Sequence, residues 1–428
     1  MSTLRIVRRE DRIDPRLPTP PERWLTADVV LVLVVASTWG FAFSTFYLLP
    51  AFLMQELAAG PAEIGFVVGT LGAATVAFTV VAAGWIDRLP RRHAMSLGAL
   101  AMSIAALGFT CVHALGPAIE MLRVLQGISY ALVVTSVGIL ITELVPHERL
   151  SQALGLSGAS MLVMNALAPA VAEPLAAAVG WQAVFLLAAF AALGSAALAT
   201  RIREPATPHA AVAPAAVRRG GLLVLLRGRL AREYAIILAL SGAAFGAVFT
   251  FQQPYALALG RERVGGFFVA YAAAAILVRV AFGHVPDRFG RHRVALGALL
   301  LYAGVILGMA VMRPGMLEVF GAIFGLAHGV FYPAINALAV SAAAPHERGR
   351  IVAIFTGSFS LGLWAGPTVL GVVAARMGYP TTFVLAAVGT LGAALLLYRS
   401  PEMRAAGALS PRVLAGRRAG ARSRQDAR

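Results

Sequence analysis

The chain of 428 residues is 59% hydrophobic and only 13% charged, with a mean hydropathy of +0.78. Because about a quarter of the residues in soluble domains are charged, this composition excludes an ordinary water-soluble enzyme. The formal net charge of +16 comes from 36 basic residues, all of them arginine, against 20 acidic ones. A single cysteine excludes an internal disulfide and a thiolate metal cluster.

Twelve apolar runs follow one another along the chain, six on each side of a polar segment. Each is close to the roughly 20 apolar residues that a helix needs to cross a bilayer. The first run follows a polar arm of 26 residues, so we expect a retained span and not a cleaved signal peptide. The runs cover residues 27–49, 63–85, 93–112, 117–143, 150–175 and 181–200, then 232–257, 264–285, 294–312, 316–341, 351–375 and 379–398. The sequence therefore predicts an all-α integral membrane protein with twelve transmembrane helices.

The arginines divide the loops into two classes. Most lie in the first arm, in alternate loops and in the last 29 residues, whereas only Arg261, Arg263, Arg313 and Arg376 lie in the other loops. The positive-inside rule then places both termini in the cytoplasm of a multi-pass protein of the cell (inner) membrane. Basic residues beside anionic lipid account for the charge, so we expect a bilayer and no nucleic acid as partner. The predicted parts are a cytoplasmic arm (1–26), a six-helix bundle (27–200), a cytoplasmic linker (201–231), a second bundle (232–399) and a basic cytoplasmic tail (400–428).

An internal repeat relates the two halves. Residues 87–92 read Asp-Arg-Leu-Pro-Arg-Arg, and residues 287–292 read Asp-Arg-Phe-Gly-Arg-His. Pro-His-Glu-Arg occurs at 146–149 and again at 345–348, while Pro169 and Gly180 match Pro367 and Gly378. Four separated matches at offsets of 198 to 200 predict a duplicated, pseudo-symmetric six-helix unit. Parallel halves of this kind place a binding site near the midplane between them.

These residues resemble the major facilitator superfamily, and the resemblance extends from about residue 27 to residue 399. The family's loop signature Gly-x-x-x-Asp-Arg-x-Gly-Arg-Arg/Lys nearly matches residues 283–292, although the first copy has Ala83 and Pro90 at two of its positions. Residues 123–127 look like the Arg-x-x-Gln-Gly motif associated with proton-coupled transport. Residues 279–293 and 324–333 look most like the arabinose-efflux or drug-efflux branch. The fifth helix departs from the antiporter signature Gly-Pro-x-x-Gly-Gly, because residues 168–173 read Ala-Pro-Ala-Val-Ala-Glu.

The repeated loops are the predicted cytoplasmic gate. By resemblance, Asp87, Arg88 and Glu143 hold this gate closed and cap the start of the eleventh helix, and Asp287 and Arg288 do the same for the fifth. The counterpart of Glu143 is Ala342, so we expect an asymmetric gate. The alternative is an ordinary solvated loop. The predicted gating set is Asp87, Arg88, Arg91, Arg92, Glu143, Asp287, Arg288 and Arg291.

Proton coupling is assigned to polar groups at apolar depth. Arg123 lies about two turns inside its helix, where a cation is costly and is expected to face a cavity; pairing with Glu120 or snorkelling is the alternative. The predicted coupling set is Arg123, Gln126, Glu173 and His328. No carboxylate falls clearly at mid-helix depth, so the proton carrier stays open among Glu56, Glu63, Glu120 and Glu173.

The substrate is expected in a mostly apolar pocket with a few orienting polar groups. The predicted lining residues are Trp39, Phe43, Tyr47, Asn165, Gln252, Gln253, Tyr255, Asn336 and Trp364. A structural role is predicted for Gly127, Arg279, Gly283, Gly290, Gly366 and Pro367.

No phosphate-binding glycine loop, nucleophile elbow or His-Glu-x-x-His motif occurs, so we expect neither an enzyme nor a cofactor or metal. With no nucleotide site, uphill transport has to draw on an ion gradient. We predict a monomeric secondary transporter that exports a small, amphipathic organic molecule in exchange for protons by alternating access. A proton symporter importing a polar metabolite, and a membrane sensor or scaffold without transport, are the alternatives.

Overall fold

The computed structural model describes residues 24–86, 88–204, 228–282, 288–342 and 348–406, which are helical with no strand among them. The first half holds α1 (Ala27–Thr45), α2 (Leu49–Leu57), α3 (Pro61–Ile86), α4 (Arg91–Phe109), α5 (Pro117–Leu144), α6 (Leu150–Val179) and α7 (Trp181–Ala199). The second half holds α9 (Arg229–Ala258), α10 (Gly266–Phe282), α12 (Arg291–Met309), α13 (Leu317–Ala342), α14 (Arg348–Arg399) and α15 (Pro401–Ala406).

The helices account for all twelve predicted spans. Nine helices of the described ranges are long and apolar enough to cross a membrane, and one of these joins α1 to α2 through a 3₁₀ turn. The 52-residue α14 is two helices in sequence, because Gly378 has a non-helical backbone (φ 82°, ψ 164°). The 19-residue α4 and the shorter α10 complete the set. This confirms the predicted all-α fold of twelve transmembrane helices.

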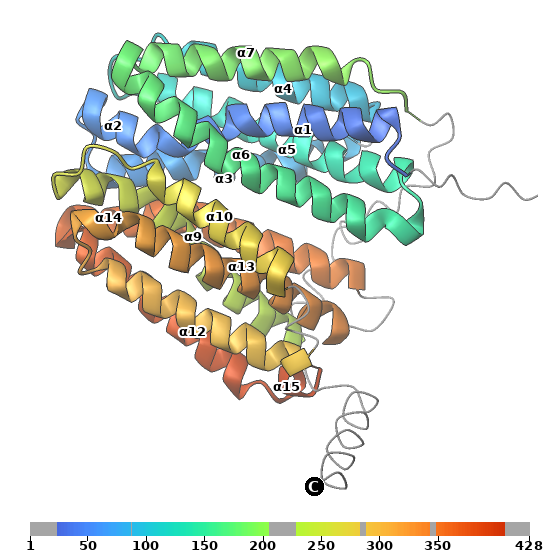
Figure 1. Ribbon diagram of the computed structural model, residues 1–428, viewed down its shortest axis with the longest axis vertical. Coiled ribbons are helices and arrows are strands. Elements are labelled where there is room, and N and C mark those ends of the chain that lie inside the picture. Colours follow the sequence, from blue (N-terminus) through green and yellow to red (C-terminus); the bar gives the residue numbers. More distant parts are fainter. Residues whose placement is uncertain (1–23, 87, 205–227, 283–287, 343–347, 407–428) are drawn as a thin grey trace, which may run out of the picture.

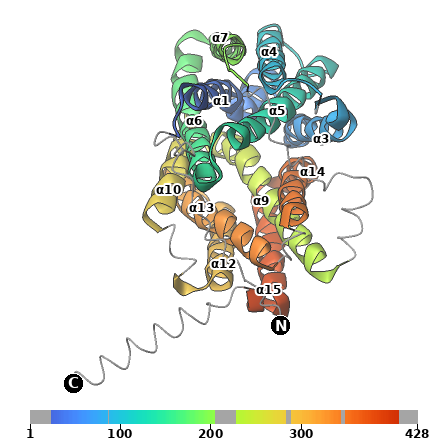
Figure 2. The same ribbon diagram turned by 90° about the vertical axis from the view of Figure 1, so that its right-hand side faces the viewer.

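The helices form two bundles that pack side by side (Figure 1). In the first bundle α1 packs on α6 and α7, α4 on α5 and α7, and α3 on α5. In the second, α9 packs on α14, and α13 on α10 and α12. The bundles meet where α3 packs on α14 and α6 on α10. Figure 2 shows α4 and α7 on the far side of the first bundle, and α12 with the red end of α14 on the far side of the second.

Apolar side chains cover the outer faces of both bundles, as a helix in contact with lipid requires. Val81 of α3 and Val280 of α10 are 85% and 81% exposed, and Phe190 of α7 is 65% exposed. Large hydrophobic side chains are exposed along most of the described helices, whereas a monomeric protein in water rarely exposes apolar surface on this scale. The exposure therefore supports a surface in contact with hydrocarbon.

The repeat is visible in the backbone. Gly180 follows α6 with φ 100° and ψ 167°, and Gly378 divides α14 with φ 82° and ψ 164°. Both are in the left-handed half of backbone space that favours glycine, so the same turn ends the fifth and the eleventh spans. The second pair differs, because Gly290 has φ 93° before α12 whereas Pro90 has φ −53° before α4. Proline cannot adopt the positive φ, so the two loops turn differently.

Glycines bring the two bundles together at one end. A Cβ atom on Gly65 of α3 would lie 2.2 Å from the carbonyl oxygen of Pro367 in α14, and one on Gly371 would lie 2.8 Å from that of Pro61. Such contacts require residues without a side chain. We call this the distal end; it carries α2, the start of α3 and the start of α10. The opposite, terminal end carries the start of α1 and the end of α14.

Candidate functional site

A cavity of about 360 Å³ lies between the bundles. Its walls come from α1, α3, α5 and α6 of the first bundle and from α9, α10, α13 and α14 of the second. Seven residues singled out in the sequence line it, namely Phe43, Tyr47, Arg123, Asn165, Arg279, His328 and Trp364. Their positions in the chain span more than 300 residues, so only the packing of the two halves brings them together.

The first bundle contributes a fixed cation. Arg123 of α5 is only 3% exposed and its guanidinium is held on three sides. Its Nε donates to the Val67 carbonyl at 3.1 Å, and its two terminal nitrogens donate to Gln126 Oε1 at 2.6 Å and to the Val68 carbonyl at 3.3 Å. Gln126 thus serves Arg123 one turn away and is not itself part of the lining. The alternative partner, Glu120, keeps a buried Oε2 that has no hydrogen bond within the described residues.

Close packing of α3 against α5 brings the Val67 and Val68 carbonyls within reach. A Cβ atom on Gly127 would lie 2.4 Å from the Leu71 carbonyl oxygen, so only glycine permits this separation. The Thr75 hydroxyl donates to the Gly127 carbonyl at 3.1 Å and adds a second link between the helices. The spacing Arg-x-x-Gln-Gly therefore places the cation, its acceptor and the packing glycine in two adjacent turns.

The second bundle contributes polar side chains with nitrogen atoms that have no hydrogen-bond partner among the described residues. His328 of α13 is 7% exposed, and its Nδ1 lies 2.9 Å from the Tyr271 hydroxyl of α10. Its Nε2 is buried and has no hydrogen-bond partner in the described part of the chain. Arg279 of α10 lines the same cavity and its Nε is likewise buried without a partner there. The sequence assigned Arg279 a structural role at the end of the helix, but the structure places it on the cavity wall.

Aromatic rings form most of the remaining wall and pack across the two bundles. Tyr47, in the 3₁₀ turn between α1 and α2, packs edge to face on Phe249 of α9, with ring centroids 5.5 Å apart. Tyr130 of α5 meets Trp364 of α14 edge to face at 6.3 Å. Phe245 stacks on Phe249 with a centroid separation of 4.2 Å. Phe245 and Phe249 lie four residues apart on one helix face, as Phe43 and Tyr47 do, and this spacing could have identified them in the sequence.

Five predicted lining residues lie elsewhere. Trp39 is buried inside the first bundle and donates from Nε1 to the Ser129 hydroxyl at 2.9 Å. Gln253 donates to the Tyr47 carbonyl at 2.7 Å, and the Tyr255 hydroxyl to the Ala310 carbonyl at 3.2 Å. The remaining two are Gln252, whose amide atoms are buried without a described partner, and Asn336, whose Oδ1 is also unpartnered within the described residues. None of these five residues is part of the cavity lining.

The predicted gate lies at the terminal end and is only partly described. Asp87, Asp287 and Gly283 lie outside the described residues. Glu204, just after α7, accepts the backbone N–H of Arg92 at 2.6 Å and so caps α4. Two more gate residues have defined contacts, since the Arg291 guanidinium donates to the Ser341 hydroxyl at 2.6 Å and that of Arg288 lies 5.7 Å from the Phe289 ring centroid. Arg91 and Glu143 also have interaction partners.

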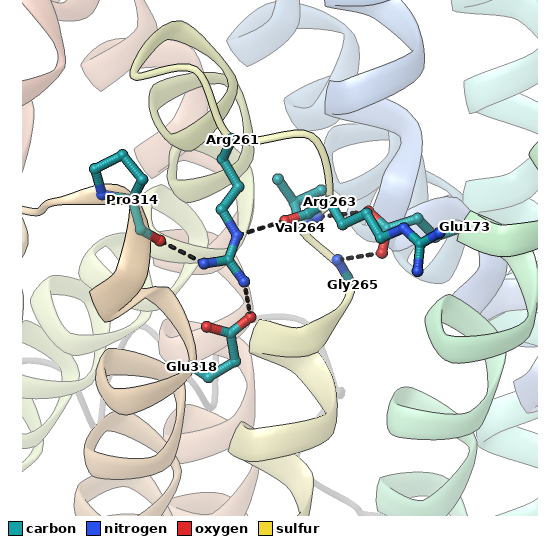
Figure 3. A network of polar contacts seen from close by, with 7 residues as sticks. All are labelled: Glu173, Arg261, Arg263, Val264, Gly265, Pro314 and Glu318. Atoms are coloured by element: carbon teal, nitrogen blue, oxygen red, sulfur yellow. Dashed lines mark hydrogen bonds and ion pairs between the residues drawn. The ribbon is translucent and has the colours of Figure 1, made fainter. Parts of the chain in front are cut away.

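At the distal end, a carboxylate of one bundle binds the backbone of the other (Figure 3). Glu173 of α6 accepts the N–H of Val264 at 2.5 Å and that of Gly265 at 3.0 Å, just before α10 begins. These N–H groups have no partner inside the helix, so an anion is favoured there. A Cβ atom on Gly265 would lie 2.8 Å from Glu173 Oε2, so a larger residue would push the carboxylate away. We call these contacts the distal latch.

A second arginine network fixes the loop that carries the latch (Figure 3). Arg261 Nε donates to the Arg263 carbonyl at 3.0 Å. Its terminal nitrogens bind the Pro314 carbonyl and the Glu318 carboxylate, both in the second bundle. Sequence reasoning missed this network, because an arginine in an outer loop carries no signal of its acceptor 57 residues away.

The central residues pack tightly behind these contacts. Gly366 of α14 is buried, and a Cβ atom there would lie 2.6 Å from the Ala243 backbone of α9. Gly246 of α9 approaches α14 similarly, with its Cβ position 2.9 Å from the Pro367 ring. The walls of the cavity in the second bundle are therefore held by backbone contact between α9 and α14.

Comparison with known proteins gives a consistent result. The model of the Major Facilitator Superfamily matches residues 30–262 and 235–422. An uncharacterised MFS-type transporter, YhhS of Escherichia coli (strain K12), is 28% identical over 166 residues, which are 38% of this chain and 40% of the relative. The chain thus aligns with about two fifths of the length of such curated relatives.

Solved structures share the whole fold. The nucleoside transporter NupG superposes with a TM-score of 0.73 at 13% identity, covering 88% of this chain and 100% of its own. A D-xylose-proton symporter superposes with a TM-score of 0.71 at 16% identity, covering 89% of this chain and 99% of its own. At these identities the likeness concerns the fold alone.

Proposed function

The chain belongs to the Major Facilitator Superfamily, and from this premise we propose that it exports a small organic molecule in exchange for protons by alternating access. It is a multi-pass membrane transporter, a class that carries small solutes and is not enzymatic. The direction of transport and the role of protons are the parts that we propose.

The observation that carries the proposal is the central cavity. It lies between the bundles and takes its walls from both, so a rotation of one bundle against the other changes its access to either side. Each wall contains aromatic groups and a cation, the buried Arg123 on one side and the partly buried Arg279 on the other. A solute bound to both walls would therefore be carried by the same motion that changes access.

Contacts at the distal end support a conformation closed on that side. Glu173 joins α6 to the start of α10, and Gly65 and Gly371 bring α3 against α14. These contacts have to separate before the distal side can open. The positive-inside distribution of arginines favours a terminal end on the cytoplasmic side of the cell membrane. We therefore propose a monomer whose central cavity opens toward the cytoplasm in this conformation.

Glu173 offers a route for proton coupling. A protonated carboxyl group loses its charge and part of its acceptor capacity, which weakens its bonds to the Val264 and Gly265 N–H groups. Glu56, Glu262 and Arg263 line a distal cavity of about 350 Å³ beside Glu173 and share its local field. Protonation would thus favour opening of the distal side, and loss of the proton would favour its closing. Exchange further requires that this proton leave toward the cytoplasmic side.

Import by proton symport is the alternative, and the sequence of α6, the fifth span, favours it. Buried Ala168 and Ala172 stand at positions where the antiporter signature has glycine, and Glu173 at the last one bonds across the bundles. A symporter would use the same cavity and the same latch but load solute and proton from the distal side together.

The test uses purified protein in sealed liposomes that contain a pH-sensitive dye. Compounds are first chosen by their ability to raise the melting temperature, since a ligand that binds only the folded state stabilises it. An outward solute gradient that drives protons inward supports exchange, whereas co-directional movement supports symport. Binding without any flux of solute or protons would establish the sensor or scaffold alternative and contradict both transport proposals.

A further inference from the structure

We infer that the central cavity binds an organic anion, a carboxylate or similar group carried on an aromatic body. This inference rests on the proposed transport function for its purpose, but it concerns binding and can be tested without transport. It follows from four properties of the cavity. These are its charge, the unpartnered hydrogen-bond donors of the second bundle, the hydrogen-bonded arginine of the first bundle, and the aromatic lining.

The first property is a positive charge that the lining residues themselves do not balance. Arg123 and Arg279 both line the cavity, and among the described lining residues none is an aspartate or a glutamate. A guanidinium away from water is costly unless an anion neutralises it. Glu120, one turn before Arg123 and outside the lining, acts electrostatically on Arg123. The described lining supplies no such anion to Arg279, so an anionic solute would provide the missing countercharge there.

The second property is the set of open donors on the second bundle. Arg279 Nε is buried without a partner in the described ranges, and a guanidinium presents its N–H groups in a fork that matches a carboxylate. His328 Nε2 is also buried and unpartnered there, while its Nδ1 is engaged by the Tyr271 hydroxyl. When that hydroxyl donates, the neutral ring carries its proton on Nε2 and becomes a donor to the cavity. Arg279 lies within electrostatic range of Tyr271 and His328, so these groups act on one region.

The third property distinguishes the two arginines. Arg123 uses Nε and both terminal nitrogens to bind Gln126 and the Val67 and Val68 carbonyls. It therefore adds positive potential but few free donors toward a solute. The anionic group is expected to bind Arg279, with Arg123 as a long-range charge on the opposite wall.

The fourth property defines the body of the solute. Phe249, Tyr47, Tyr130 and Trp364 present rings from both bundles, and rings prefer offset or edge contacts with another ring. The volume of about 360 Å³ lies at the lower end of the 300–1,000 Å³ typical of ligand pockets, roughly enough for one or two fused rings and a charged group. With the terminal end in the cytoplasm, an inside-negative potential also favours outward movement of one negative charge, by roughly 50-fold in concentration ratio per 100 mV.

The test compares two solutes of the same shape on the purified full-length protein. 2-Naphthoate carries the anion, and 2-naphthamide is its neutral counterpart. Melting temperature and calorimetric titration should give at least a roughly tenfold tighter binding of naphthoate, since charge-assisted bonds in a desolvated site are worth that factor or more. Equal affinity for the two solutes, preference for the amide, or no response to either would overturn the inference.

Variants identify the responsible residue. Arg279→Gln should weaken naphthoate binding about 10- to 100-fold and leave the amide unchanged within about twofold, because only the charged fork is removed. Arg279→Lys keeps the charge and should restore part of the affinity. Arg313→Gln removes an equal charge from an exposed distal position and should change neither. A loss of both solutes alike in Arg279→Gln, with the melting temperature without solute and the elution volume unchanged, would contradict a direct role.

The outcome separates the inference from the proposed function. Selective naphthoate binding without flux in liposomes would leave the anion site standing and remove the transport proposal. Flux of a neutral or cationic solute with no naphthoate selectivity would do the reverse.

Discussion

The two walls of the central cavity treat their arginines differently. In the first bundle Arg123 is enclosed by Gln126 and two helix carbonyls, whereas in the second bundle Arg279 keeps a buried nitrogen with no described partner. A cation whose three nitrogens all bond within its own bundle stabilises that bundle, and one with an unpartnered nitrogen has bonding capacity available for a solute. The difference separates a residue that maintains the wall from a residue that can bind what enters the cavity.

The largest expected effect comes from removing the hydrogen bonds of Arg123 in the first bundle. Arg123→Ala removes three charge-assisted bonds and should lower the free energy of unfolding by about 3 kcal/mol, since each is worth roughly 1.5–3 kcal/mol but the freed carbonyls keep their helix partners. The measurement is the melting temperature of the purified protein. Arg313→Ala, at an exposed position, is the control. An unchanged melting temperature would mean that Arg123 is not a structural part of its wall.

The next effect is on solute binding, with little or no loss of stability. Arg279→Ala removes a partly buried charge with an unsatisfied nitrogen, so we expect the stability without solute to stay within about 0.5 kcal/mol or to rise. Binding of 2-naphthoate should fall about 30-fold in the same variant, which corresponds to about 2 kcal/mol. If Arg279→Ala destabilises the protein as much as Arg123→Ala does, the two walls are equivalent and the comparison fails.

A third prediction concerns the distal latch, which joins the two bundles at the distal end. Glu173→Gln removes the charge and one acceptor facing the α10 start, so the distal side should open about fivefold more often, or about 1 kcal/mol. Labelling of Ala176→Cys by an impermeant maleimide, in a Cys111→Ser background, measures this opening. Gln55→Ala alters the same distal cavity at an exposed, uncharged position without touching the latch and should leave the labelling rate unchanged.

The smallest expected effect comes from the glycine under the latch. Gly265→Ala places a methyl group 2.8 Å from Glu173 Oε2, so the carboxylate has to shift by a few tenths of an ångström. We expect faster labelling in the same assay, by about twofold, corresponding to about 0.4 kcal/mol. Gly315→Ala, in an open turn of the same end, is the matched control. A rate that matches this control would show that the latch tolerates the methyl group.

Much of the fold follows from local sequence signals. Each span is a run of apolar residues whose length the bilayer fixes, and the turn at Gly180 and Gly378 follows from a glycine at matching positions. The Arg-x-x-Gln-Gly spacing likewise brings Arg123 to Gln126, because residues three apart share a helix face.

The site was only partly predictable, because its contacts join residues that are far apart in the sequence. Gln253 and Tyr255 look like polar groups aimed at a substrate, yet they donate to carbonyls of Tyr47 and Ala310 far along the chain. His328 meets Tyr271 across 57 residues, and nothing in either local sequence indicates the other. Which face of a helix turns to the cavity depends on how the bundles rotate, and apolar helices of low amphipathicity do not specify that rotation.

The sequence alone determined the twelve spans, their repeat and the family, because bilayer thickness and helix periodicity act on neighbouring residues. Tertiary structure alone decided that Arg279 and His328 join Arg123 around one cavity and that Glu173 binds the start of α10. These arrangements arise where glycines let backbones approach, and the resulting contacts join residues whose separation in the chain is far greater than the reach of any local pattern.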